Sequence, residues 1–184
     1  MSFVHLRCHS EYSLLDSTIQ TRFLVNRVNE LNQPAVALTD HNVLHGAIEF
    51  YKNARNYAQI KPIIGIEICL RESMDGQIKG DNVEKKVFHT LLLARDNTGY
   101  KNLIDLTNIA NLSSYEEPCI SKDDLVGHSE GLICTTGCLD AEIPYKILTG
   151  CNLSNLKDII GWYYEIFGKE NFFFELQKEN PKRH

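Results

Sequence analysis

Side chains able to bind metal ions recur in this sequence where apolar segments end. Imidazole, carboxylate and thiol groups together suit Zn²⁺, Mn²⁺ or Fe²⁺, whereas Mg²⁺ alone prefers oxygen ligands. A group of such metal ions bridges a phosphate and lowers the pKa of bound water towards neutrality. Hydrolysis of a phosphoester is therefore the chemistry that a cluster of these residues would support. The candidate ligands are His9, Asp16, His41, Glu67, His89 and Cys138.

Most of these candidates also have a purely structural explanation, and the sequence leaves both open. A histidine at a strand end is readily satisfied by a backbone carbonyl, and Cys138 alone would be a small core residue. Asp16 could cap the helix that follows it, as could the two hydroxyl residues after it. Glu67 is harder to explain structurally because it lies inside the apolar run Pro62–Leu70. An unpaired carboxylate is costly there and needs a cation or a hydrogen-bond donor.

Six apolar, β-branched segments predict the strands that would position these residues. Helical periodicity in most of the stretches between them favours βα units and a parallel sheet. Functional groups in such an architecture gather at the C-terminal ends of the strands. His89 does not fit this pattern because it lies near the start of its segment, so either that strand begins earlier or His89 is a core residue. The predicted strands are Phe3–Leu6, Ala35–Leu38, Pro62–Leu70, Val87–Ala94, Gly131–Thr135 and Phe172–Leu176.

Four segments with apolar residues three or four positions apart predict helices between these strands. The polar segment Glu72–Lys86 contains two glycines and predicts an excursion between two strands, with a hairpin as one possible form. Repeated strand and helix units favour an incomplete barrel over an open sheet. The predicted helices are Leu24–Leu31, Val43–Tyr57, Thr98–Leu112 and Leu153–Phe167.

Length and composition indicate one ordinary globular domain. The chain has 184 residues, of which 43% are hydrophobic and 23% charged, so disorder does not dominate. A net charge of −5 excludes a general cationic surface for nucleic acid, and any contact with DNA must be local or indirect. We find no signal sequence and no apolar stretch long enough for a membrane span, and we therefore expect a cytoplasmic protein that binds no membrane.

The six cysteines are predicted to be reduced thiols. They are scattered along the chain and form no CxxC pair, which argues against a disulfide framework. Cys8, Cys69 and Cys134 are assigned to the core, since a free cysteine usually behaves as a small hydrophobic residue.

Several blocks of the sequence resemble a known family. Together they are similar to the PHP (polymerase and histidinol phosphatase) domain found at the N-terminus of the alpha subunit of bacterial DNA polymerase III. They occur in the family's order and cover nearly the whole chain, which makes the resemblance specific. The blocks are Phe3–Asp16, Ala37–Asn42, Lys61–Glu67, His89–Ala94, Asn97–Leu103 and Gly131–Leu139.

The resemblance implies a distorted (β/α)7 barrel, similar to a TIM barrel, with a trinuclear metal site. The family's His-x-His motif falls on positions 7 and 9, and its later motifs fall on the other candidate ligands given above. Its last ligands, an Asp-x-His pair, would lie beyond residue 184. The resemblance thus implies that residues 1–184 are an N-terminal fragment of the PHP domain, truncated before the last strand, and that the polymerase palm, thumb and fingers are absent.

Arg7 stands where the family pattern has a metal-binding histidine. A guanidinium group keeps its proton and cannot coordinate a metal ion. If Arg7 points inwards, it places a fixed positive charge where a divalent cation would sit, and the site is degenerate. If it points outwards, a partial metal site survives.

Two functions follow as expectations. In the first, the domain is a scaffold within the replicative polymerase that docks the proofreading exonuclease subunit and holds no metal, or only a partial complement of Zn, Mn or Fe. DNA and Mg²⁺ would then be handled by the rest of the alpha subunit. In the second, the domain is an active metal-dependent phosphoesterase, either a 3′–5′ exonuclease or a pyrophosphatase.

A barrel without its closing strand would leave an open edge, and self-association of this fragment is therefore expected.

Overall fold

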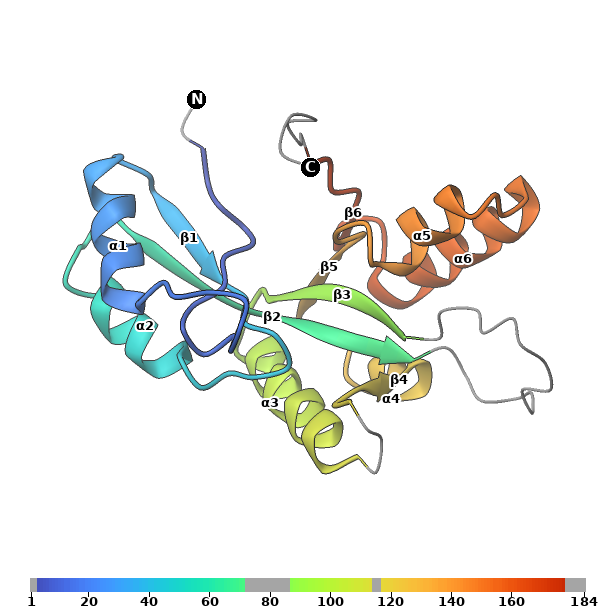
Figure 1. Ribbon diagram of the computed structural model, residues 1–184, viewed down its shortest axis with the longest axis horizontal. Helices are drawn as coiled ribbons and strands as arrows, with labels where there is room; N and C mark the ends of the chain where they lie inside the picture. Colours follow the sequence, from blue (N-terminus) through green and yellow to red (C-terminus); the bar gives the residue numbers. More distant parts are fainter. Residues whose placement is uncertain (1–2, 72–86, 114–116, 178–184) are drawn as a thin grey trace.

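A twisted mixed sheet runs through the molecule and joins the six strands that the structure describes (Figure 1). The structure is a computed structural model that describes residues 3–71, 87–113 and 117–177. The order of the main strands is β1-β2-β3-β5-β6, and the short strand β4 pairs with β2. The strands are β1 (Ala35–Leu38), β2 (Lys61–Arg71), β3 (Val87–Ala94), β4 (Ile120–Ser121), β5 (Leu132–Thr135) and β6 (Phe172–Phe173).

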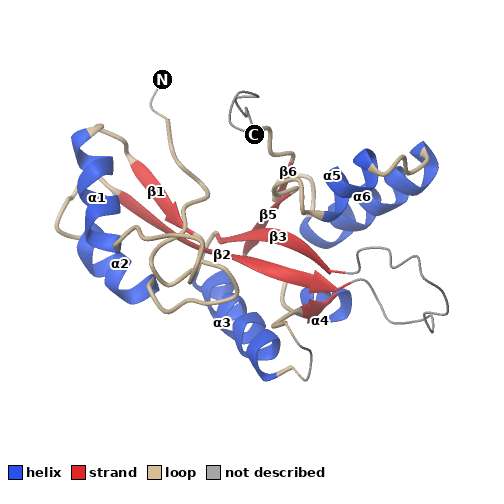
Figure 2. Cartoon of the chain, in the orientation of Figure 1, coloured by secondary structure: helices blue, strands red, loops and turns tan. Residues whose placement is uncertain are grey.

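The helices divide into two groups, each packed on its own part of the sheet (Figure 2). Helices α1 and α2 enclose a core with β1 in which Val25, Val36 and Phe50 are fully buried. The remaining helices contribute to a larger core around β2, β3 and β5. The helices are α1 (Thr21–Glu30), α2 (Ala47–Ala54), α3 (Asn97–Leu112), α4 (Lys122–Gly127), α5 (Glu142–Leu148) and α6 (Leu153–Phe167).

Helix α3 is fixed at its start by a cap and by a close backbone approach. Asp96 caps the helix by accepting a hydrogen bond from the Gly99 N–H at 3.0 Å. A Cβ atom on Gly99 would lie 1.9 Å from the carbonyl oxygen of Gly131, the residue before β5. Gly131 has a φ of +72°, which glycine adopts at no steric cost. These two glycines let the start of α3 lie directly against the start of β5.

The prediction of a parallel sheet is wrong for the centre of the molecule. β2 pairs antiparallel with β3, and β3 pairs antiparallel with β5, whereas β1–β2 and β5–β6 are parallel. A parallel pair needs a crossover connection, usually a helix, and the described residues contain no helix between β2 and β3. The start of β3 therefore lies beside the end of β2, with His89 opposite Cys69. This reversal explains why His89 lies near the start of its strand.

The fold is mixed α/β as expected, but the described sheet does not close into a barrel. Phe3–Leu6 is not a strand and pairs with β1 only through an isolated bridge between His5 and Val36. At the other edge, β6 is shorter than the predicted Phe172–Leu176. The expected (β/α)7 barrel is thus not formed by residues 3–71, 87–113 and 117–177.

Other predicted elements agree with the structure to different degrees. Leu153–Phe167 forms a helix over its full predicted range, and the predicted helix Val43–Tyr57 is shortened to α2. Helices α4 and α5 and strand β4 were not predicted from the sequence. The predicted excursion Glu72–Lys86 lies outside the described residues. All six cysteines are free thiols.

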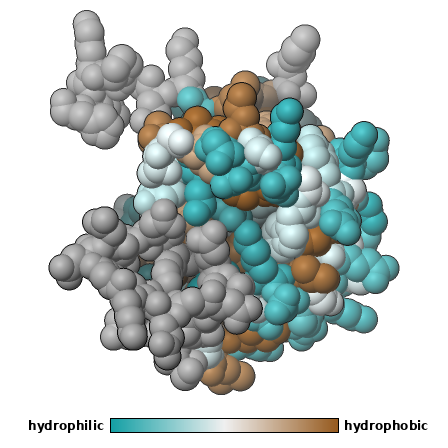
Figure 3. Space-filling view, turned by 90° about the vertical axis from the view of Figure 1, so that its right-hand side faces the viewer, coloured by the Kyte–Doolittle hydropathy of each residue, from teal (hydrophilic) through white to brown (hydrophobic). Residues whose placement is uncertain are grey.

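None of the helices that the structure describes is long and apolar enough to cross a membrane. The face shown in Figure 3 carries apolar side chains in small groups among polar ones.

Candidate functional site

All six predicted ligand residues meet at one place in the structure. Most of them contact either Asp16 or Glu67. The Nδ1 atom of His9 lies 2.5 Å from Asp16 Oδ2, and its Nε2 atom lies 2.9 Å from Glu67 Oε2. His41 Nε2 lies 3.1 Å from Asp16 Oδ2, and His89 Nδ1 lies 3.3 Å from Glu67 Oε1. The Sγ atom of Cys138 lies 3.9 Å from Glu67 Oε1 and completes the cluster.

Backbone pairing sets the position of the central residues. Glu67 lies in the middle of β2 between the buried residues Ile66 and Ile68. The Glu67 N–H donates to the Asp40 carbonyl at 3.1 Å, and the Asn42 N–H donates to the Glu67 carbonyl at 2.9 Å. This bridge places His41 directly beside Glu67. Because β2 is held on both sides, the Glu67 carboxylate is fixed at the centre of the cluster.

Glu67 is a buried carboxylate, with only 2% of its side chain exposed. Burial alone would raise its pKa, but hydrogen bonds from His89, His9 and Arg7 outweigh burial and hold the pKa far below its ordinary value. A carboxylate in this apolar run was expected to need a cation or a donor. The structure supplies several donors.

Arg7 points into the cluster and binds both oxygens of Glu67. Its Nε atom donates to Oε2 at 2.7 Å, and its Nη2 atom donates to Oε1 at 2.6 Å. This is the paired geometry in which a guanidinium recognises a carboxylate most strongly. Of the two orientations that the sequence left open, the structure has the inward one, with 24% of the Arg7 side chain exposed.

The histidines of the cluster differ in their electrostatic surroundings. Hydrogen bonds with Cys138, Cys69 and Glu67 raise the pKa of His89 to about 12, against the effect of burial. Burial would lower the pKa of His9, but its bonds to the two carboxylates raise it. The pKa of His41 is lowered, chiefly by burial. Two imidazoles thus favour the charged form and one favours the neutral form.

Cys138 lies on the loop between β5 and α5, next to Gly137 with its φ of +65°. A hydrogen bond with His89 is the main reason why the pKa of its thiol is lowered. Cys138 is half-buried and reaches the carboxylate of Glu67 rather than the apolar core. A thiol in these surroundings is a better metal ligand than a core cysteine.

Asp16 does not cap the helix that follows it. Helix α1 begins at Thr21, its N-cap residue is Gln20, and no side chain caps it. Asp16 instead extends from the loop of residues 10–17 towards His9 and His41, and half of its side chain is exposed. Burial would raise its pKa, but these histidines, above all His9, lower it. The capping explanation of Asp16 is therefore wrong.

Sequence reasoning missed several polar residues that hold the cluster in place. Asn42, at a φ of +55°, accepts a hydrogen bond from the Cys69 N–H and donates to the Cys69 thiol. Cys69 is buried as expected, yet it also bonds to His89. Cys134 is a core residue, whereas Cys8 is only half-buried. The polar run Thr39–Asn42 directly after a buried strand was the available signal.

Two groups of three residues in the described chain have ligand atoms within 4.8 Å of one another. One is His9, His41 and Glu67, and the other is Glu67, His89 and Cys138. Their nitrogen, oxygen and sulfur donors suit Zn²⁺ or a similar transition metal. Both groups share Glu67, however, and Arg7 already binds both of its oxygens. The residues present therefore fit a full metal cluster only in part.

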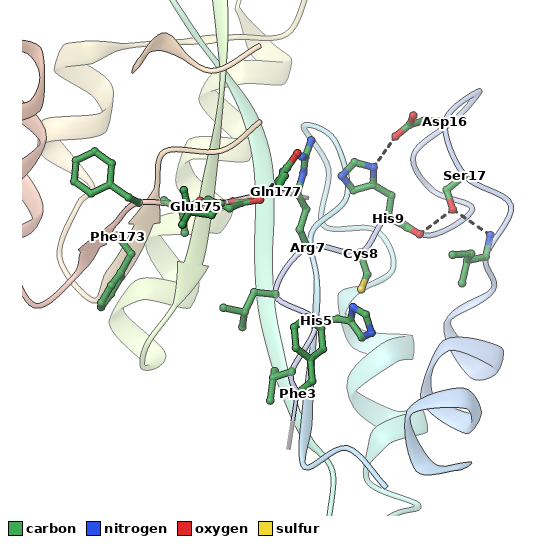
Figure 4. A pocket seen from close by; sticks show the side chains of 16 residues that line it. Phe3, His5, Arg7, Cys8, His9, Asp16, Ser17, Phe173, Glu175 and Gln177 are labelled. Atoms are coloured by element: carbon green, nitrogen blue, oxygen red, sulfur yellow. Dashed lines mark hydrogen bonds and ion pairs between the residues drawn. The ribbon is translucent and has the colours of Figure 1, made fainter. Parts of the chain in front are cut away.

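A cleft of about 800 Å³ opens onto the cluster (Figure 4). One wall is the N-terminal segment of residues 3–9, and the other is the segment of residues 173–177. Figure 4 shows the Arg7 side chain with Gln177 on one side and His9, bonded to Asp16, on the other. The Arg7 side chain is thus partly exposed to solvent in this cleft.

Comparisons with known proteins point to one family. The family model described as "PHP domain" matches residues 5–179. The DNA polymerase III subunit alpha of Borreliella burgdorferi is 43% identical over 98% of this chain and 16% of that protein. The subunit of the same name from Thermus aquaticus is 41% identical over 96% of this chain and 15% of that protein. The chain thus spans about one-sixth of the length of these relatives.

One solved structure with a similar course of the backbone is an amidohydrolase from Chromobacterium violaceum. Its TM-score is 0.43 at 14% identity, and the match covers 86% of this chain and 43% of that one.

Proposed function

Because this chain belongs to the PHP domain family, we propose that it works as the PHP domain of a bacterial DNA polymerase III alpha subunit and that its metal site is degenerate. The curated relatives named above, all subunits of this kind, support the first part. DNA synthesis would be carried out by the rest of such a subunit with Mg²⁺. The domain itself, within residues 1–184, acts as a scaffold for the polymerase and docks its proofreading exonuclease subunit in the cytoplasm.

The contact between Arg7 and Glu67 is the observation that carries the degenerate site. Metal ions bind through lone pairs on a carboxylate, and the guanidinium already uses both oxygens of Glu67. Arginine cannot yield by losing its proton. Its positive charge also occupies the position of a cation, and a divalent ion beside it would be repelled at short range. The fixed charge of Arg7 thus takes over the structural work of a metal ion.

Elemental analysis of a longer purified chain, which includes the expected last strand with its Asp-x-His pair, tests this proposal. We expect the wild type to hold well under one equivalent of Zn, Mn or Fe. Arg7→His should raise the metal content, because it restores an imidazole next to Glu67. The matched control is Arg27→His, which adds a histidine at an exposed ion pair on α1 and should leave the metal content unchanged.

The proposal fails if the wild type carries two or three tightly bound metal ions and hydrolyses a phosphoester in a reaction that Glu67→Ala abolishes. That result would favour the second candidate, a metal-dependent 3′–5′ exonuclease or pyrophosphatase. The two groups of potential ligands support this candidate. Metal ions bound there would supply an activated water molecule. His9, His41 and Glu67 would hold one ion, and Glu67, His89 and Cys138 would hold another.

A further inference from the structure

Asp40 is a buried carboxylate behind the cluster, and the proposed function makes no use of it. Only 1% of the residue is exposed. Its Oδ1 atom accepts hydrogen bonds from the Ser10 N–H and the Ser13 hydroxyl, both at 2.6 Å. Its Oδ2 atom accepts from the Ser10 hydroxyl at 2.8 Å. A carboxylate with three donors in the interior is a strong anchor, because each lost bond would leave a buried polar group unpaired.

These bonds join the loop of residues 10–17 to the end of β1. The Ser13 hydroxyl donates to Asp40 and also accepts from the His41 N–H at 3.1 Å. The Ser13 carbonyl accepts from the Asp16 N–H at 3.1 Å. The buried Ser13 is thus hydrogen-bonded to the backbone of both His41 and Asp16. The side chains of these two residues also contact each other.

Tyr12 packs its ring beside Gly46 and His45, but the tip of the loop has no such packing among the described residues. Leu14 and Leu15 form its tip, with relative exposures of 83% and 109%, and Leu15 has a φ of +68°. Such a conformation is uncommon for leucine and costs free energy. Ser13 is the buried residue between Glu11 and Asp16. Polar bonds therefore contribute much to holding the loop, and three of them end on Asp40.

We propose that Asp40 is a positioning residue, which acts through Ser10 and Ser13 to set where the Asp16 carboxylate meets His9 and His41. The inference concerns the same cluster as the proposed function, but it holds whether Arg7 or a metal ion occupies the centre. Without this anchor the loop would keep its covalent ends, but the carboxylate would no longer be held between the two imidazoles.

The chemistry of the anchor distinguishes conservative from disruptive changes. In Asp40→Asn, the amide oxygen can accept the two bonds now made to Oδ1, and the amide NH₂ can donate to the Ser10 hydroxyl. Asp40→Leu removes every acceptor. Ser13→Ala removes one oxygen and leaves the His41 N–H without its partner. It is the mildest change that breaks the connection.

The test is the imidazole ¹H–¹⁵N spectrum of the wild type and the variants. We expect Ser13→Ala and Asp40→Leu to shift the resonances of His9 and His41, and Asp40→Asn to restore wild-type positions. The resonances of His128, whose Nδ1 atom bonds to the Asp124 carbonyl, should not move in any variant. Ser113→Ala is the matched control, because it removes a single hydroxyl bond at the end of α3.

The proposal is overturned if Ser13→Ala lowers the melting temperature while the His9 and His41 resonances stay at wild-type positions. It is equally overturned if Asp40→Asn shifts them as far as Ser13→Ala does. Should Asp40→Leu not fold, the other two variants decide. Metal content is measured separately, so tightly bound metal in the wild type would refute the degenerate site without changing this comparison.

Discussion

At the scale of single residues, the centre of the cluster is a buried carboxylate whose donors come from distant parts of the chain. The apolar run around Glu67 predicted that its carboxylate would be buried and would need a partner. In the structure His89, His9 and Arg7 all form hydrogen bonds with it. The direction of Arg7 could not be predicted, because inward and outward orientations differ only in contacts with residues about 60 positions away. The role of Asp40 was missed because its partners are serines, which are equally common in exposed loops.

Glu67→Gln should destabilise the protein in a pH-dependent way. Removing one partner of a buried ion pair costs about 3 kcal/mol, and Arg7 would be left unpaired. The pKa of Glu67 in the folded state lies below its unfolded value of about 4.3. The stabilisation that the ionised carboxylate gives the folded state is therefore present above that pH and is lost as the pH falls. Urea unfolding of both proteins should therefore give a large difference in free energy near neutrality that shrinks in acid.

The control for this prediction is Glu30→Gln, which breaks an ion pair with Arg27 in which both side chains are more than half exposed. That change should cost less than about 1 kcal/mol. A difference for Glu67→Gln that stays constant down to strongly acidic pH would show that Glu67 does not carry its charge into the folded state.

At the scale of elements, periodicity predicted the existence of helices and strands well and their directions poorly. Leu153–Phe167 was predicted over its full length because its apolar residues repeat every three to four positions. In the structure Asn152 also caps the start of this helix. The direction of β3 depends on the connection before it, and the apolar run Val87–Ala94 reads the same in either direction. Short elements such as β4 were missed because two residues have no period.

Gly99→Ala should destabilise the junction of α3 and β5. The new methyl group would lie 1.9 Å from the Gly131 carbonyl oxygen, so one of the two elements must move. We expect a loss of about 3 kcal/mol, at the upper end for overpacking, measured by urea unfolding. Gly161→Ala is the control, because no atom lies within 4 Å of its added methyl group and alanine is the better helix former. Equal changes in the free energy of unfolding for Gly99→Ala and Gly161→Ala would show that the close approach of α3 and β5 does not require a glycine at position 99.

At the scale of the whole molecule, the described sheet is open where a barrel was expected. The N-terminal segment and residues 173–177 face each other across the cleft, and no described strand lies between them. Closure of a barrel depends on every strand in the ring, so a sequence pattern found in most of them cannot establish it. The number of strands, their tilt and their register must all agree before a sheet closes.

Exposed strand edges recruit other strands, and we therefore expect the chain to self-associate through this cleft. Leu176 lies on the cleft wall and is 96% exposed. Leu176→Lys should weaken association, measured by sedimentation velocity over a range of concentrations, without lowering stability. Leu148→Lys, at an exposed position on α5 away from the cleft, should leave association unchanged. A wild type that stays monomeric at the highest concentration would count against the open edge as an interface.

The two walls of the cleft also bring the ends of the described chain to the same side of the molecule (Figure 1). A short linker from one wall to the other would make a circular permutant, with new ends opened at Gly150 in the exposed turn between α5 and α6. Such a rearranged chain would keep every pairing of the sheet and would tie down the segment that carries Arg7 at both of its ends.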